Sequence, residues 1–104
     1  MFSLDELART IAERAQASVD ESYTRSLLDK GPKGAAKKFG EEAIEFIIAA
    51  VGEDSAALRD EAADVLYHLL VVLETRGVRL AEVLTELEQR TPRSGHEEKA
   101  SRRK

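Results

Sequence analysis

Cysteine and tryptophan are absent from this chain of 104 residues, and its only aromatic side chains are two tyrosines and three phenylalanines. The lack of cysteine excludes a disulfide framework, a thiolate metal site and a thiol nucleophile. Because aromatic residues are scarce, a hydrophobic core must be built mainly from leucine, isoleucine, valine and alanine. The length fits one domain.

Long hydrophobic runs are missing as well. Runs such as residues 69–73 are far shorter than the ~20 residues of a membrane-spanning helix. The first six residues include two acids and no apolar leader, so we expect a cytoplasmic protein. A glycine-rich phosphate loop is also absent, because Gly31, Gly34 and Gly40 match neither GxxxxGK[ST] nor GxGxxG.

The formal net charge of −4 argues against nucleic acid as a partner. Two basic clusters nevertheless stand out. Residues 99–104 hold four cations and no acid, and a second cluster contains Lys30, Lys33, Lys37 and Lys38. The two clusters suit a small anionic ligand, but the same charges fit a solvated tail and a solvated helix start.

Hydrophobic periodicity predicts helices and no strands. A capping box formed by Ser3 and Glu6 precedes the first helix. The predicted helices run from about residue 4 to 17, from 32 or 33 to 51, from 55 to 76, and from 80 to 90. Residues 18–32 are predicted to form an ordered loop that can include a short helical turn. We therefore expect an all-α, four-helix catalytic domain over residues 1–93 and a basic tail over residues 94–104.

Four acids lie at mirrored positions around residue 53. Glu42 and Glu45 form one i, i+3 pair, and Glu61 and Asp64 form another. If the flanking helices are antiparallel, both pairs share one spot, because residues three apart share a helix face. Four converging anions repel one another unless a cation lies between them, and carboxylate oxygens suit Mg²⁺ or Mn²⁺.

A solvated set of surface acids is the simpler alternative. Against it, Asp64 lies mid-helix among core-like neighbours, where aspartate has poor propensity and no capping role. His68 shares a face with Glu61 and Asp64. It is either a structural residue bonded to a neighbour such as Asp64, or a group that supports a ligand or contacts substrate. Tyr67 is expected to pack in the core.

A magnesium site beside lysine and arginine is suited to attack on a phosphoanhydride. Residues 37–45 (KKFGEEAIE), 61–70 (EAADVLYHLL) and 94–102 (SGHEEKASR) resemble the phosphoribosyl-ATP pyrophosphatase family of MazG-like, all-α nucleotide pyrophosphohydrolases. The resemblance implies a MazG-like bundle, a homodimer, and Mg²⁺-dependent hydrolysis of phosphoribosyl-ATP to phosphoribosyl-AMP and pyrophosphate, the second step of histidine biosynthesis. Phe39 and the segment 34–36 depart from the family pattern in packing but leave the acids intact.

By position, the resemblance implies roles for particular residues. Glu42, Glu45, Glu61 and Asp64 would bind metal, and Glu41 would act beside Glu42 and Glu45 in catalysis. The implied substrate contacts are Lys37, Lys38, His68, Lys99 and Arg102.

Two other functions stay open. One is a pyrophosphohydrolase acting on another (deoxy)nucleoside triphosphate, and the other is a non-enzymatic dimerisation module. The wide apolar arc from Leu58 to Leu73 predicts a dimer built on that helix and on neighbouring apolar faces. We also hypothesise that the tail folds over the substrate phosphates.

Overall fold

The computed structural model describes residues 1–18 and 22–92, and in these ranges the protein consists of five helices without a strand. The helices are α1 (Leu4–Arg14), α2 (Tyr23–Asp29), α3 (Gly31–Ala50), α4 (Ser55–Thr75) and α5 (Leu80–Arg90). The prediction of an all-α protein is confirmed. None of the described helices combines the length and apolar character needed to cross a membrane.

The prediction of four helices is wrong within the described residues, because α2 occupies part of the expected loop. Ser22 begins this helix, and its hydroxyl oxygen accepts a hydrogen bond from the Arg25 backbone N–H at 3.2 Å. Serine and threonine read as loop residues by propensity, but at an N-cap they start a helix. Leu27, only 1% exposed, anchors α2 in the core.

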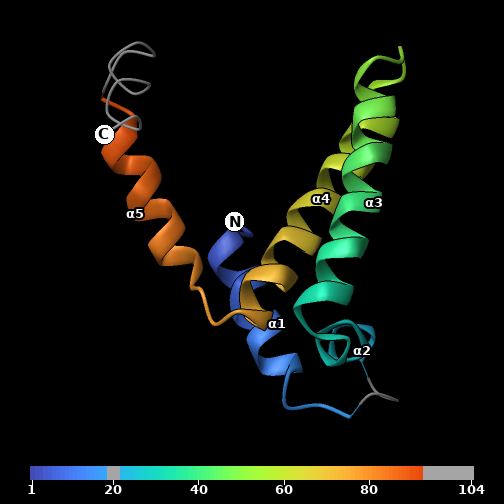
Figure 1. Cartoon of the computed structure of the whole chain (residues 1–104). Coiled ribbons are helices and arrows are strands. Elements are labelled where there is room, and N and C mark those ends of the chain that lie inside the picture. Colours follow the sequence, from blue (N-terminus) through green and yellow to red (C-terminus); the bar gives the residue numbers. More distant parts are fainter. Residues whose placement is uncertain (19–21, 93–104) are drawn as a thin grey trace.

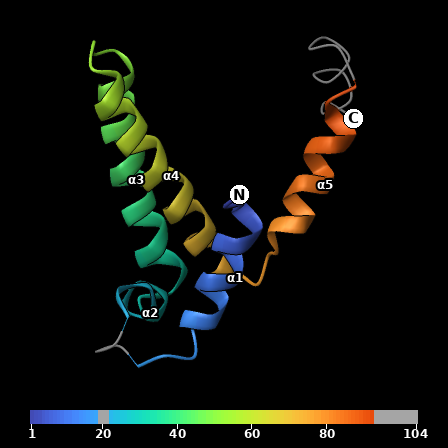
Figure 2. The same ribbon diagram turned by 180° about the vertical axis from the view of Figure 1, so that it is seen from behind.

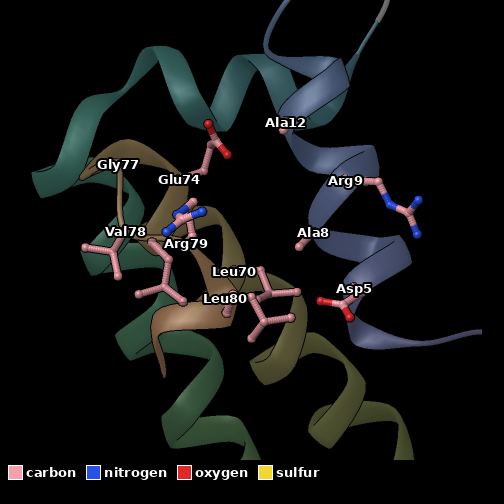
Figure 3. Close-up of a pocket in the computed structure, with 12 residues that line it drawn as sticks. Asp5, Ala8, Arg9, Ala12, Leu70, Glu74, Gly77, Val78, Arg79 and Leu80 are labelled. Atoms are coloured by element: carbon pink, nitrogen blue, oxygen red, sulfur yellow. The ribbon is translucent and has the colours of Figure 1, made fainter. Parts of the chain in front are cut away.

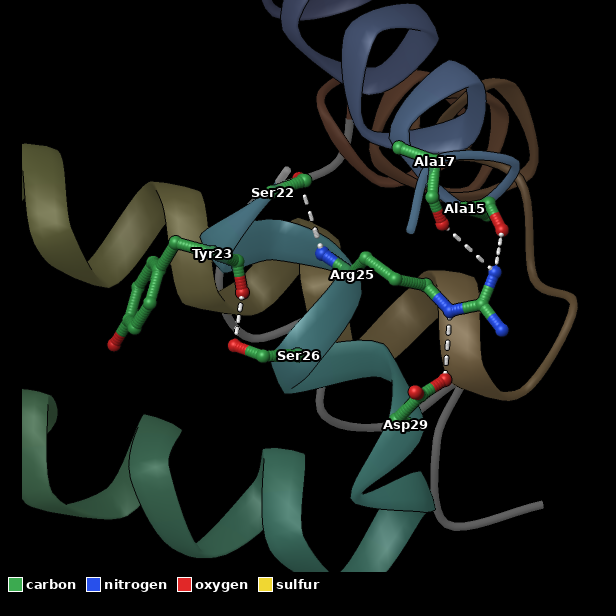
Figure 4. A network of polar contacts seen from close by, with 7 residues as sticks. All are labelled: Ala15, Ala17, Ser22, Tyr23, Arg25, Ser26 and Asp29. Carbon is green, nitrogen blue, oxygen red and sulfur yellow. Dashed lines mark hydrogen bonds and ion pairs between the residues drawn. The ribbon is translucent and has the colours of Figure 1, made fainter. Parts of the chain in front are cut away.

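Arg25 fixes α2 to the end of α1 (Figure 4). Its guanidinium group donates hydrogen bonds to the carbonyl oxygens of Ala15 and Ala17 and forms an ion pair with Asp29, with 2.7 Å between Nε and Oδ1. These contacts satisfy carbonyl groups that the end of α1 leaves without helical partners. The contacts of Arg25 therefore hold α2 in place just before α3 begins. Gly31, at φ +73°, makes the turn between α2 and α3.

The long helices α3 and α4 form an antiparallel hairpin (Figure 1). Asp54 begins α4, because its Oδ1 accepts the backbone N–H of Ala56 at 2.9 Å. At the other end of the hairpin, α1 and α2 pack against α4. The buried core lies where these helices meet, and its members are Ile11, Leu27, Ala35, Leu70 and Val71.

Helix α5 departs from the rest of the chain. Gly77, at φ +68°, follows the end of α4, and Glu82 caps α5 by accepting the Arg79 backbone N–H at 2.8 Å. Figures 1 and 2 show α5 pointing away from the α3–α4 hairpin. No residue of α5 is buried, so this helix adds little to the core of the monomer.

Candidate active site

The hairpin brings three of the four predicted acids together. Glu42 and Glu45 extend from α3 and Glu61 from α4, and one carboxylate oxygen from each lies within 4.8 Å of the other two. We call these three residues the acid cluster. The antiparallel register deduced from the mirrored spacing produces this convergence.

Asp64 is not part of the acid cluster. Its side chain is exposed, although it lies one turn beyond Glu61 and shares a face of α4 with it. The mirrored register therefore places the backbone of Asp64 on the correct face but does not by itself turn the side chain inward. A metal-binding role for Asp64 stays a prediction.

Buried oxygens in the acid cluster lack hydrogen-bond donors. Glu42 is only 8% exposed, and Oε2 of both Glu42 and Glu61 is buried without a partner among the described residues. A buried charged oxygen without a donor is costly. A hard divalent cation would supply positive charge to these oxygens, so the residues present fit a Mg²⁺ or Mn²⁺ site.

His68 lies beside the cluster and is 5% exposed. Its Nδ1 is 2.8 Å from the main-chain oxygen of Asp64. Because a carbonyl oxygen only accepts, we infer that Nδ1 carries a proton and donates it. Nε2 is buried and without a partner in the described part of the chain. The predicted structural bond to Asp64 is present, while the second ring nitrogen stays available to a ligand.

The pKa values of two acids of the cluster shift in opposite directions. A hydrogen bond with Glu42, together with the charges of Glu42 and Glu61, raises the pKa of Glu45. Burial by itself would raise the pKa of Glu42, but hydrogen bonds with Glu45 and Lys38 and the charge of Lys38 lower it overall. Glu45 therefore holds a proton more readily than Glu42 does.

Lys38 connects the cluster to a cavity on the same helix. Its Nζ lies 3.3 Å from Oε1 of Glu42, and this hydrogen bond and charge raise the pKa of Lys38. The cavity has a volume of about 380 Å³ and is lined by Tyr23, Lys30, Gly34, Lys37, Lys38 and Glu41. We call it the lysine cavity. Three predicted site residues, Lys37, Lys38 and Glu41, thus share one hollow.

Sequence reasoning missed two residues of the lysine cavity. Tyr23 lies in the segment predicted to be a loop, and it is 60% exposed. Lys30 was noted only as a member of a basic group. The signal that would have found both is the Ser22 helix cap, since a helix starting there places Tyr23 and Lys30 at opposite ends of α2, beside the start of α3.

The family model of phosphoribosyl-ATP pyrophosphohydrolases matches residues 4–91. The chain belongs to this family. Its segment from α1 to the end of α5, including the acid cluster, lies within the match. The resemblance found in the sequence is thereby confirmed.

Relatives within the phosphoribosyl-ATP pyrophosphohydrolase family match almost the whole chain. A phosphoribosyl-ATP pyrophosphatase of Dinoroseobacter shibae is 60% identical over 98% of this chain and 100% of its own length. One from Azorhizobium caulinodans is 58% identical, over 98% of this chain and 94% of its own length. Phosphoribosyl-ATP pyrophosphatase 1 of Rhodopseudomonas palustris is 56% identical, over 99% and 96%.

A second cavity of this phosphoribosyl-ATP pyrophosphohydrolase family member lies between α1, the end of α4 and the start of α5 (Figure 3). Its volume is about 570 Å³, and none of the predicted site residues lines it. The predicted substrate contacts Lys99 and Arg102, and the tail that carries them, lie outside the described residues.

Proposed function

We propose that this protein hydrolyses phosphoribosyl-ATP to phosphoribosyl-AMP and pyrophosphate in histidine biosynthesis, in the cytoplasm and with Mg²⁺ as cofactor. The observation that carries the proposal is the acid cluster, in which buried carboxylate oxygens lack donors in a chain of this family. The names of its relatives support the substrate.

Glu42, Glu45 and Glu61 are the proposed metal ligands, with Asp64 as a fourth. When bound there, Mg²⁺ would supply positive charge to the phosphate oxygens and acidify water at the site. The orphaned oxygens of Glu42 and Glu61 are the groups that such a cation would satisfy. Binding would also displace the proton that Glu45 holds more readily than a free carboxyl.

The remaining residues hold the substrate and move a proton. Water adds across the anhydride between the α- and β-phosphates, and pyrophosphate leaves. We assign Glu41 as the group that accepts the proton of this water, because it lies next to Glu42 and outside the acid cluster. Lys38, paired with Glu42 of the acid cluster, would stabilise charge on the triphosphate. Lys37 would contact a substrate phosphate without taking part in the chemical step. Nε2 of His68 would accept a hydrogen bond from water or a substrate hydroxyl.

The decisive experiment offers phosphoribosyl-ATP and Mg²⁺ to the purified protein and measures both products. We expect equal amounts of pyrophosphate and phosphoribosyl-AMP, and none without a divalent cation. Glu61→Gln serves as the control for contaminating activity. Turnover of other nucleoside triphosphates in place of phosphoribosyl-ATP would establish the rival pyrophosphohydrolase, and no Mg²⁺ binding would favour a dimerisation module.

We further propose a homodimer. The sequence predicts an interface on α4 and neighbouring apolar faces. Leu70 and Val71 of the α4 arc are buried in the core of the monomer, whereas Leu66 and Leu69 are exposed. A neighbouring stripe of exposed aliphatic side chains lies on α3 and its C-cap residue, at i, i+3, i+4 and i+7. Its members are Ile44, Ile47, Ile48 and Val51, each at least 59% exposed. A second copy of the chain would remove this surface from water.

Helix α5 supports the same proposal. It has 11 residues, none of them buried, and an isolated helix of this length is marginal in water. Leu84 and Leu87 are 41% and 51% exposed and belong to one apolar stripe of α5. Packing of this stripe against a second copy would stabilise the helix.

Sedimentation equilibrium at micromolar concentration tests the dimer. We expect the wild-type protein to have twice the monomer mass and Ile48→Glu to shift it toward the monomer. Thr85→Glu, an exposed position off the apolar stripe of α5, is the matched control and should stay dimeric. A monomeric wild-type protein would overturn the dimer without affecting the proposed reaction.

A further inference from the structure

The lysine cavity holds more positive charge than the acid cluster requires. Lys38 is already paired with Glu42. Lys30 and Lys37 line the same cavity, and neither has a carboxylate within 4 Å among the described residues. Ammonium groups that face one hollow repel one another, and an anion placed between them removes that repulsion. Three ammonium groups line the cavity against the single carboxylate of Glu41, so it is complementary to a phosphate group.

The position of the cavity indicates which phosphate it would take. Lys38 and Glu42 are one helical turn apart, so the cavity begins beside the acid cluster. Gly34 lies eight residues before Glu42, which corresponds to about 12 Å along the helix axis. A pyrophosphate group bound at the acid cluster is too short to fill this distance. Phosphoribosyl-ATP has a second phosphate, on the 5′ carbon of its added ribose, and the adenine separates it from the triphosphate.

We propose that the lysine cavity binds the 5′-phosphate of the phosphoribosyl group and thereby selects phosphoribosyl-ATP over simple nucleoside triphosphates. This inference rests on the proposed function. Lys30 and Lys37 hold the phosphate, and Tyr23 forms the wall against which a substrate ring packs. Figure 4 shows the Tyr23 ring pointing away from the Arg25 network, on the side of α2 opposite the contacts with α1.

The local structure is built to present these groups. Arg25 locks α2 against the end of α1 and leaves Tyr23 exposed. Gly34 allows the side chain of Lys30 to lie against α3, because a Cβ at position 34 would be 2.5 Å from Cβ of Lys30. A larger residue at position 34 would force Lys30 to move. The turn between α2 and α3 therefore fixes the position of the Lys30 Cβ.

Steady-state kinetics with phosphoribosyl-ATP tests the subsite through Lys30→Ala and Lys37→Ala. Loss of one charge-assisted contact is expected to raise KM about tenfold for each variant and to change kcat little. Lys33→Ala is the matched control, since Lys33 is an exposed lysine of α3 that does not line the cavity. Its KM should equal that of the wild-type enzyme. A similar rise in KM for Lys33→Ala would mean that the effect comes from the overall charge of the protein and not from the cavity, and it would overturn the proposal.

Inhibition identifies the phosphate that is bound. Ribose 5-phosphate should compete with phosphoribosyl-ATP in the wild-type enzyme and lose this effect in the Lys30→Ala, Lys37→Ala double variant, while inhibition by pyrophosphate should persist in both. If pyrophosphate inhibition weakens in the double variant and ribose 5-phosphate has no effect on the wild type, the cavity holds the leaving group and the proposal is wrong.

The proposed function and the subsite can fail separately. Wild-type protein that does not turn over phosphoribosyl-ATP contradicts the function alone. Calorimetric titration with ribose 5-phosphate then still measures the subsite. Binding that depends on Lys30 and Lys37 but not on Lys33 supports it, and the absence of binding to the wild-type protein overturns it.

Discussion

The acid cluster and the cavity between α1, α4 and α5 differ in whether their buried polar atoms have hydrogen-bond partners. The larger cavity, about 570 Å³, has apolar walls that include Leu70 and Leu80 and charged residues such as Arg9 and Arg79 (Figure 3). None of its lining side chains is a buried polar group without a partner in the described ranges. All three such atoms belong to Glu42, Glu61 and His68. Unsatisfied polar atoms, more than volume, mark the place where a ligand belongs.

Removing one carboxylate of the acid cluster should have the largest effect. Glu42→Gln and Glu61→Gln are each expected to lower kcat/KM for phosphoribosyl-ATP at least about 100-fold, since changes around metal ligands alone cost 10–100-fold. Arg9→Ala, in the other cavity, should stay within about twofold of wild type. A strong loss of kcat/KM in Arg9→Ala together with normal turnover in Glu61→Gln would show that the active site is the larger cavity and not the acid cluster.

Leu70→Ala should separate stability from chemistry. Leu70 is 5% exposed and belongs to both the core and the larger cavity. Truncating a buried leucine costs about 2–5 kcal/mol, so we expect a clear loss of unfolding free energy in urea and unchanged kcat where the variant is folded. The neighbouring Leu69→Ala, 36% exposed, is the control and should lose less. Equal losses at both positions would contradict this description of the core.

Magnesium should stabilise the protein only through the acid cluster. At a free Mg²⁺ concentration ten times Kd, linkage gives about 1.4 kcal/mol. For a domain of this size that corresponds to a rise in Tm of roughly 6–11 °C. Differential scanning calorimetry at fixed protein concentration measures it. Glu61→Gln should abolish the shift and Arg9→Ala should retain it. A shift that survives in Glu61→Gln would place the ion elsewhere.

The smallest effect concerns the raised pKa of Glu45. The folded state raises the pKa of Glu45 above its ordinary value, first through the hydrogen bond with Glu42. This stabilising contribution is therefore present at low pH and is lost as pH rises through the folded pKa. Glu45→Gln keeps a donor toward Glu42 at every pH.

Without metal, Glu45→Gln should consequently gain Tm relative to wild type at pH 8 and show little gain at pH 4. Thermal unfolding in a chelating buffer at both values measures this difference. Glu53→Gln, an exposed glutamate of the hairpin turn, is the control and should show no such dependence. A gain confined to acidic pH would mean that the pKa of Glu45 is not raised in this way.

The sequence alone determined the long elements and the position of the acids along them. Periodicity places α1, α3, α4 and α5 close to their observed ranges because each has its own apolar stripe and end signals. The spacing of Glu42, Glu45 and Glu61 around one turn specifies their convergence, since an antiparallel hairpin fixes register. The same residues, with the stretches around them, predicted the family that the comparison confirmed.

Only the tertiary structure decided what depends on contacts between distant segments. The short helix α2 forms because Ser22 caps it and Leu27 is buried among other helices, whereas local propensity favours a loop. Whether Tyr23 faces the core or solvent follows from that packing. The inward or outward orientation of Asp64 depends on the rotamer of its side chain. Sequence spacing sets the face of a helix, but burial and partners set the side chain's direction, because they arise only when separate elements meet.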